Sequence, residues 1–350
     1  MRSVFWENNQ LKMIDQRILP ARFEIVSFNK HKQVAEAIKN MTVRGAPAIG
    51  AAAAFGLALA GYESASSSRV DLLADLRHAA TVLKDSRPTA VNLAWAVDRV
   101  MGVVANIPEG RSADELCQIV LDEAQKIADE DVEINKRMAE HGATLINDGD
   151  TIIHHCNTGA LATVDWGTAL GVIRTAHEQG KKIHVLVDET RPRLQGARLT
   201  AWELEQYGIS YEIISDNMSG HFLKAGKVQK CFVGSDRTTA NGDVANKIGT
   251  YMLALAAHDN GVPFYPVVPT STIDLSLASG DLIPIEERNP NEVLDIQFQG
   301  ESVTPKNAKA RNPAFDVTPN RLVTGIVTEN GIAYPPFEVS LRKLTMDDRP

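Results

Sequence analysis

Two reactive side chains, Cys156 and Asp236, each follow a short apolar run and lie in a turn rich in small polar residues. Cys156 lies in the segment 154–159 (HHCNTG), and Asp236 lies in the segment 234–237 (GSDR). In an open parallel sheet, ligands bind outside the carboxyl ends of the strands, so two such ends can place a thiol and a carboxylate in one crevice. A thiol that faces a carboxylate suggests proton-transfer chemistry.

The segment around Cys156 allows three interpretations. His154, His155 and Cys156 suggest a metal site, but adjacent strand residues point to opposite faces and no second Cys/His cluster follows, so we expect no metal. A thiol beside Gly and Asn amides at a strand end could act as an acid, a base or a nucleophile. A buried, inert cysteine is the structural alternative, and it fits Cys117 and Cys231 better.

Two further segments have the composition of anion sites. In Arg44–Gly50 (RGAPAIG), glycine allows close approach to a ligand, Pro47 suits a first helical turn, and a helix N-terminus attracts anions. Arg44 could add a bidentate phosphate contact. Arg87, with Thr89, repeats this pattern. A tight turn before a closely packed Ala-rich helix, and a simple N-cap with a solvated arginine, are the structural alternatives.

Polar residues also gather after other expected strands. Gln195 or Arg191 could contact a sugar hydroxyl or an interface carboxylate, or only tie their loop down. Asp216 and Asp243 are interpreted as helix caps. The Asn246-Lys247 pair, within an apolar helix start, suggests ligand contact. For Asp236 the structural alternative is an ion pair with Arg237 or Arg191.

Composition excludes several classes of function. The chain has 350 residues, a formal charge of −8, three cysteines without CxxC spacing, no secretory signal pattern and no apolar run near the ~20 residues of a membrane span. Broad nucleic-acid binding is disfavoured because it needs clustered Lys and Arg. Neither GxGxxG in its strand context nor a P-loop is present, so we expect no nucleotide cofactor. A reducing cytoplasm and a small anionic ligand fit these features.

The elements that must position these residues fall into two groups. Before about residue 146 the chain is mostly helical, and Ser112 with Glu115 forms a capping-box pattern at the start of a long helix over 112–146. The other predicted helices there are Lys32–Met41, Ala48–Glu63, Val70–Leu83 and Ala90–Val104.

From Asp150 strands and helices alternate, which is typical of a doubly wound α/β fold with a mostly parallel sheet. The predicted strands are Thr151–His155, His184–Asp188, Tyr211–Ser215, Lys230–Val233 and Phe264–Val268, and the predicted helices are Trp166–Gln179, Arg198–Tyr207, Met218–Ala225 and Val244–Asn260. The tail from Ile283, with a strand-like segment at Leu322–Thr328, is expected to pack on this domain. We expect a helical domain over 1–125 and a Rossmann-like α/β domain over 126–350.

Taken together, these segments resemble the methylthioribose-1-phosphate isomerase family, within a superfamily shared with regulatory subunits of the factor that exchanges nucleotide on translation initiation factor two. The resemblance extends over nearly the whole chain. The matching segments are Leu11–Pro20, Arg44–Gly50, Arg87–Leu93, His155–Thr163, Glu189–Leu204, Gly234–Tyr251, Pro269–Asp274 and Gly280–Arg288.

The resemblance implies an aldose-ketose isomerase of methionine salvage that works as a homodimer. It places the catalytic residues on Cys156 and Asp236. It places the substrate contacts on Arg44, Gly45, Ala46, Arg87, Gln195, Asn246 and Lys247. The chemistry would open the sugar ring and move hydrogen from C2 to C1, with Asp236, kept protonated by an apolar setting, as the acid. Cys156 would be the partner base or would stabilise the developing charge.

The sequence departs from the family pattern at a few positions. Ser235 stands where Ala is usual, Thr238 stands where Ile is usual, and residues 164–166 (VDW) are larger than usual. The substituent at the sugar C5 is therefore open, and 5-deoxyribose 1-phosphate and ribose 1,5-bisphosphate are alternative substrates. Our hypothesis is that Trp166 and the Leu161/Ala162 pair line the pocket of that substituent. A non-catalytic regulatory role is a further alternative, which the presence of both Cys156 and Asp236 disfavours.

Overall fold

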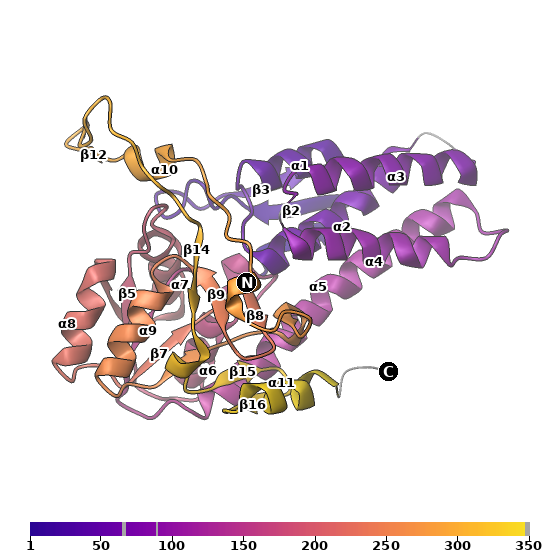
Figure 1. Cartoon of the computed structure of the whole chain (residues 1–350). Helices are drawn as coiled ribbons and strands as arrows, with labels where there is room; N and C mark the ends of the chain where they lie inside the picture. The colour runs from indigo at the N-terminus through magenta and orange to yellow at the C-terminus, as the bar shows by residue number, and fades with distance from the viewer. Residues whose placement is uncertain (65–67, 89, 347–350) are drawn as a thin grey trace. The chain divides into compact units, whose positions relative to one another are not determined.

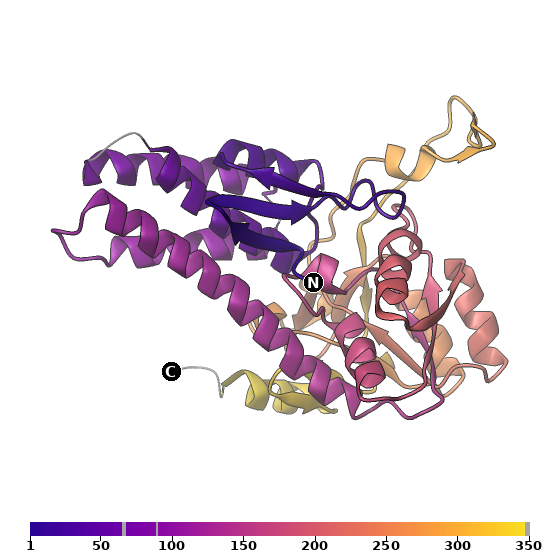
Figure 2. The same ribbon diagram turned by 180° about the vertical axis from the view of Figure 1, so that it is seen from behind.

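The computed structural model, drawn in Figure 1 and from behind in Figure 2, describes residues 1–64, 68–88 and 90–346. The chain divides into two compact units, Met1–Asn135 with Gly159–Gly167, and Lys136–Thr158 with Thr168–Pro350. Helix α5 (Ala113–Ala143) begins in the first unit and ends in the second. Thr89, which was predicted to stand with Arg87 at a helix start, lies outside the described residues.

The first unit combines a small antiparallel sheet with helices. Its helices are α1 (His31–Lys39), α2 (Ala46–Glu63), α3 (Arg69–Asp85) and α4 (Val91–Ala105), followed by α5. They lie on the segments that periodicity predicted as helices. Its sheet has the order β1-β2-β3, with β1 at Val4–Glu7, β2 at Gln10–Ile14 and β3 at Ile25–Phe28. The prediction missed this sheet, although Asn8 and Asn9, with φ of 54° and 55°, form the tight turn between β1 and β2.

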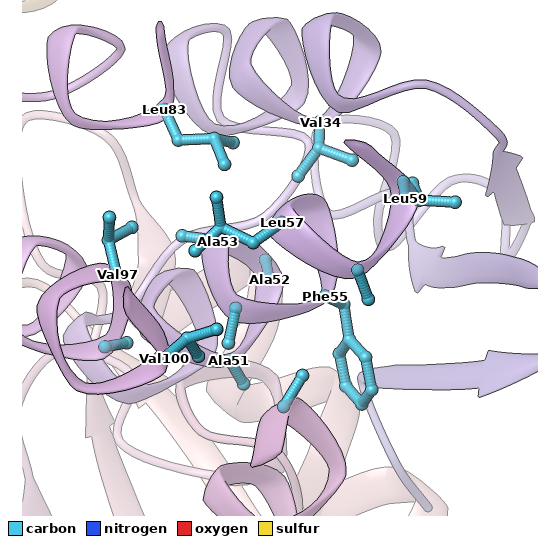
Figure 3. Close-up of a cluster of buried hydrophobic side chains, with 14 of the residues drawn as sticks. Val34, Ala51, Ala52, Ala53, Phe55, Leu57, Leu59, Leu83, Val97 and Val100 are labelled. Atoms are coloured by element: carbon cyan, nitrogen blue, oxygen red, sulfur yellow. The ribbon is translucent and has the colours of Figure 1, made fainter. Parts of the chain in front are cut away.

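Helix α2 forms the centre of the first unit's core. Its small residues from Ala48 to Gly61 are buried, and Figure 3 shows Val34 of α1, Leu83 of α3 and Val97 of α4 around them. Among the described residues, α2 alone is long and apolar enough to cross a membrane, but 78% of that window is buried inside the protein. This apolar run, longer than we expected, is a core helix.

The start of α2 has the backbone that the Arg44–Gly50 pattern predicts. Gly45 precedes the helix with φ of 94°, and proline stands in the first turn. A Cβ on Gly45 would come within 2.1 Å of the carbonyl oxygen of Ala162, so this position requires glycine. The tight turn before a closely packed helix is therefore present, and an anion contact at Arg44 stays a prediction.

The capping box predicted at the start of α5 is confirmed. The backbone N–H of Ser112 donates to the Glu115 carboxylate at 2.8 Å, and the N–H of Glu115 donates to Ser112 Oγ at 3.2 Å. These bonds satisfy amides that the first helical turn leaves without partners.

Replacing Ser112 by alanine should lower the free energy of unfolding by about 1 kcal/mol, because an N–H at the helix start loses its acceptor. Denaturant titration followed by circular dichroism measures this change. Ser27→Ala, at an exposed position in β3, should change stability by less than about 0.5 kcal/mol. Equal stability of Ser112→Ala and wild type would show that water replaces the cap.

The second unit is built on a five-stranded parallel sheet of order β10-β7-β4-β5-β6. Its strands are β4 (Thr151–His154), β5 (His184–Asp188), β6 (Ser210–Ile214), β7 (Lys230–Val233) and β10 (Phe264–Pro266). The chain runs outward from β4 through β5 to β6, and then returns to the other side of β4 as β7. This reversal between β4 and β7 is the switch point at which doubly wound folds bind ligands.

Helices connect these strands as expected. They are α6 (Ala169–Glu178), α7 (Ala201–Tyr207), α8 (Ser219–Lys224) and α9 (Thr250–Asp259). A π-helical turn at Gly196–Thr200 precedes α7 and overlaps the first residues of the helix predicted at Arg198–Tyr207. The predicted α/β fold of this part of the chain is confirmed.

The predicted helix Val244–Asn260 is wrong over its first residues. Val244–Lys247 forms strand β9, which pairs with β8 (Arg237–Thr239) and β14 (Phe315–Thr318) in a second sheet of order β11-β8-β9-β14, where β11 is Ile273–Asp274. Gly249, with φ of 104°, breaks the chain direction before α9. Two backbone N–H groups at that start, of Gly249 and Tyr251, donate to Asp316 of β14.

The tail packs on the second unit, as predicted. The segment contains α10 (Asn291–Leu294), the hairpins β12 (Gln297–Phe298) with β13 (Glu301–Ser302) and β15 (Ile326–Thr328) with β16 (Gly331–Ala333), and α11 (Phe337–Met346). The N–H of Val268 donates to the carbonyl of Val327 at 2.8 Å, and Ile326 and Phe337 are buried in this unit's core. The strand predicted at Leu322–Thr328 is shorter, at β15.

Candidate active site

The backbone of Cys156, just past β4, is strained and held on both sides. Its φ is 74°, a left-handed conformation that costs a non-glycine residue of order 1–3 kcal/mol. The N–H of Cys156 donates to Thr190 Oγ1 at 2.9 Å, and its carbonyl accepts a bond from Thr200 Oγ1 at 2.7 Å. Such strain persists where the surroundings impose it, and it is concentrated at functional sites.

The thiol of Cys156 is buried and touches a side chain that the sequence singled out. Gln195 Nε2 lies 3.4 Å from the Cys156 sulfur, and both residues are less than 9% exposed. The Oε1 atom of Gln195 is buried without a hydrogen-bond partner among the described residues. A buried acceptor without a donor costs about 1–3 kcal/mol, so a ligand hydroxyl at this oxygen would be favoured.

His155 connects the Cys156 turn to two other segments. Its Nδ1 lies 2.8 Å from Asp188 Oδ2 at the end of β5, and its Nε2 lies 2.9 Å from the carbonyl oxygen of Ile248. The other carboxylate oxygen of Asp188 accepts a bond from Ser219 at 2.5 Å. The three strand ends that carry Cys156, Asp188 and Asn246 are therefore joined through one buried ring.

A second buried network lies behind Asn157. Its Nδ2 donates to Glu203 Oε1 at 2.8 Å and to Thr200 Oγ1 at 3.2 Å, and Glu203 is 1% exposed. The Tyr207 hydroxyl lies 3.3 Å from the other Glu203 oxygen. Because Thr200 also binds the Cys156 carbonyl, this network supports the strained turn.

Asp236 stands between β7 and β8, on the strand end next to that of Cys156. Its N–H donates to the carbonyl of Ala245 at 2.9 Å. The side chain is exposed, so the apolar setting that we expected around its carboxyl group is not found. Arg237 pairs with Asp274 at 2.9 Å, and Arg191 donates to the carbonyls of Pro192 and Val293.

The two departures next to Asp236 contact each other. The hydroxyls of Ser235 and Thr238 are 3.0 Å apart, and Thr238 is fully buried. Two positions expected to be apolar thus form a polar pair beside the candidate acid. Replacement of Ser235 alone by an apolar residue would leave the buried Thr238 hydroxyl without this partner.

Asn246 and Lys247 lie on β9. Asn246 is buried and donates to Thr250 Oγ1 at 3.0 Å, and the Lys247 ammonium donates to the carbonyl of Ala314 at 2.9 Å, 4.5 Å from the centre of the Phe315 ring. The bond from His155 to Ile248 places this segment beside the Cys156 turn.

The other predicted contacts lie in the first unit. Arg44, Gly45 and Ala46 surround the start of α2, and half-buried Arg87 lies before α4. The residues that we expected to line the pocket of the 5-substituent also belong to this unit; they are Leu161, Ala162 and Trp166. Their participation in one site with Cys156 stays a prediction.

The acidic residues near His155 do not form an open metal site. Single ligand atoms of His155, Asp188 and Asp216 lie within 4.8 Å of one another. Both ring nitrogens of His155 have partners, and the Asp216 oxygens each accept a backbone N–H at 2.7 Å, from Thr190 and Arg191. Asp216 therefore fixes the loop at Thr190 and Arg191. We had expected it to cap the next helix, and that prediction is wrong.

Sequence reasoning singled out Cys156 and Gln195, which lie in contact, but did not single out the residues that support them, His155, Asp188 and Glu203. His155 stands next to Cys156, but its partners Asp188 and Ile248 are 33 and 93 residues away. No local spacing connects such partners. A buried histidine at a strand end, together with an aspartate at the next strand end, was the available signal.

Comparison with known proteins defines first the class and then the family. Residues 42–335 match the Initiation factor 2 subunit family. Methylthioribose-1-phosphate isomerase of Synechococcus sp. is 52% identical, over 99% of this chain and 98% of its own, and that of Thermotoga maritima is 51% identical over 98% of each. The chain belongs to the methylthioribose-1-phosphate isomerase family.

Solved structures share the fold of this chain over nearly its whole length. The crystal structure of 5-methylthioribose 1-phosphate isomerase from Pyrococcus horikoshii is 48% identical with a TM-score of 0.94, over 99% of this chain and 96% of that one. A structure described as translation initiation factor eIF-2B, subunit delta, from A. fulgidus is 44% identical with a TM-score of 0.91, over 99% of both chains. The resemblance inferred from the motifs is confirmed over the full length.

Proposed function

We propose that this chain converts 5-methylthioribose 1-phosphate to 5-methylthioribulose 1-phosphate in methionine salvage, as an aldose-ketose isomerase. The observation that carries the proposal is the strained, buried Cys156 at the switch point of the parallel sheet, beside a glutamine with an unsatisfied carbonyl. The names of relatives about half identical over the full length support the same substrate.

The reaction requires acid and base because the phosphate on O1 prevents ordinary hemiacetal opening. We propose that bound substrate covers the exposed Asp236 carboxyl group and keeps it protonated, so that it donates a proton to the ring oxygen as the C1–O4 bond breaks. One hydrogen then moves from C2 to C1, the C2 hydroxyl loses its proton, and the carbonyl forms at C2. Cys156 would be the partner base or would stabilise the developing charge. The hydrogen that leaves C2 is the one that C1 receives, so the proposed step consumes no outside oxidant or reductant.

Binding is assigned to the residues that the family pattern marks. Arg44, Arg87 and the amides at Gly45 and Ala46 would hold the phosphate, which a helix N-terminus attracts. Asn246, Lys247 and Gln195 would position the sugar, and fixed orientation lowers the barrier. We further propose that the protein works as a cytoplasmic homodimer.

Turnover of three sugars tests the substrate. We expect isomerisation of 5-methylthioribose 1-phosphate with the highest kcat/KM, weaker turnover of 5-deoxyribose 1-phosphate and very little of ribose 1,5-bisphosphate, because an added phosphate needs further cations at the 5-position. Product ketose, followed by NMR, is the measurement.

Preference for the bisphosphate would overturn the proposed 5-substituent while keeping the reaction. Absence of turnover of all three sugars by folded protein would instead favour the non-catalytic alternative, since the A. fulgidus relative is described as a translation initiation factor subunit. A loss of activity from the Ser235→Ala/Thr238→Ile double variant on one sugar alone would connect that polar pair to substrate choice.

A further inference from the structure

We infer that His155 is a positioning residue that, as a buried imidazolium, fixes the Cys156 turn against the segment carrying Asn246 and Lys247. Its effect on catalysis depends on the proposed isomerase function, whereas its protonation state and its bonds do not.

The hydrogen-bond partners of the ring require a donor at Nε2. The carbonyl oxygen of Ile248, 2.9 Å from Nε2, can only accept, so Nε2 carries a proton. Nδ1 lies 2.8 Å from an oxygen of Asp188, whose other oxygen already accepts a bond from Ser219. A neutral Nδ1 would need a proton on Asp188, and burial does raise the pKa of Asp188. The bonds from His155 and Ser219 and the charge of His155 act in the opposite direction, so we infer an ionised Asp188 that accepts both bonds, which makes the ring an imidazolium.

The electrostatic surroundings favour the same state. Burial alone would lower the pKa of His155, but the hydrogen bond to Asp188 and the charges of Asp188, Cys156 and Asp216 together raise this pKa to about 9. Asp316 of β14 also interacts favourably with His155, and the nearby His154 opposes its charge. Among the interactions described, the acidic groups Asp188, Asp216 and Asp316 favour a charged ring, and only His154 opposes it.

The ring fills the corner between three segments. It is fully buried, and a Cβ on Gly249 would come within 2.8 Å of its Cε1 atom. Asp316 holds the N–H groups of Gly249 and Tyr251 on the far side of that corner. Loss of the ring would therefore free Ile248, and with it the adjacent Asn246-Lys247 pair, relative to Cys156.

Charge adds to position. A positive ring at residue 155 and a negative charge on the adjacent Cys156 sulfur would stabilise each other. Such charge would develop as the thiol gives up a proton. A neutral side chain at residue 155 keeps part of the packing and loses this effect.

His154, the last residue of β4 and the neighbour of His155 in the chain, provides a matched control. Its Nδ1 lies 2.9 Å from the carbonyl of Phe232, its Nε2 lies 3.3 Å from the Thr158 hydroxyl, and burial lowers its pKa to about 4. The two histidines are equally buried, but one is neutral and the other charged.

The first test is ¹⁵N NMR of wild-type protein labelled at histidine. At pH 7 we expect His155 to show two protonated ring nitrogens and His154 to show one, with assignment by the His155→Gln and His154→Gln variants. A neutral ring at residue 155 would overturn the inference, whatever the enzyme activity.

The second test is kinetic, with His155→Gln, Asp188→Asn and His154→Gln. We expect kcat to fall by about 10²-fold in the first two, because small displacements of catalytic groups have effects of this size, and to stay near the wild-type value in His154→Gln. In wild type, activity should decline as pH rises through about 9, and this decline should be absent in His155→Gln. Unchanged kcat in folded His155→Gln, or an unchanged pH profile, would assign the ring a purely structural role.

Discussion

Replacing Cys156 by serine should lower kcat for 5-methylthioribose 1-phosphate by about 10³-fold, within the range that a positioned acid or base contributes. Serine has nearly the same shape and can keep the contact with Gln195, so substrate binding should change little. A hydroxyl gives up its proton far less readily than a thiol, and its oxygen carries negative charge less well. Steady-state kcat and KM separate these two effects.

Cys231 supplies the matched control for this experiment. It lies fully buried in β7, the strand next to β4, and burial raises its pKa so that it stays a neutral thiol. Cys231→Ala should keep kcat at the wild-type value while losing some stability through a small cavity. If Cys156→Ser retains kcat within about tenfold of wild type, the inert buried cysteine is the correct interpretation of Cys156.

Local periodicity was enough to predict most elements of the fold. Helix α2 and strands β5 and β7 were recognised because each buries a continuous apolar segment, and the alternation after Asp150 gave the parallel sheet. The capping box at Ser112 was also correct, since both of its bonds join residues three positions apart. Interactions of this range are encoded in the local sequence.

Elements stabilised by distant partners were predicted less well. Asp243 was expected to cap a helix, but its carboxylate accepts N–H groups from Gly280 and Asn320, 37 and 77 residues away. Val244 and its neighbours consequently form β9, where pairing with β14 outweighs the helical pattern. Short strands such as β8 and β14 carry too few residues for an alternating pattern to be recognised.

The candidate site shows the same division. Cys156 and Gln195 were named from their strand ends and lie in contact. The charge state of His155 could not be predicted from the sequence. It depends on Asp188 and on the Ile248 carbonyl, and the residues next to His155 in the chain do not indicate either partner. The exposure of Asp236 likewise depends on how β8 leaves β7, which periodicity does not predict.

Asp236→Asn should also lower kcat by about 10²- to 10⁴-fold, because a carboxamide of the same shape cannot deliver a proton to the ring oxygen. The backbone bond from Asp236 to Ala245 needs no side chain, so the turn between β7 and β8 should stay in place, and KM should change little. Asp259→Asn, at an exposed aspartate at the end of α9, removes the same charge from the same unit and should leave kcat unchanged. Equal kcat for Asp236→Asn and wild type would transfer the acid role to another group, whereas a rise in KM alone would show that Asp236 binds substrate without supplying a proton.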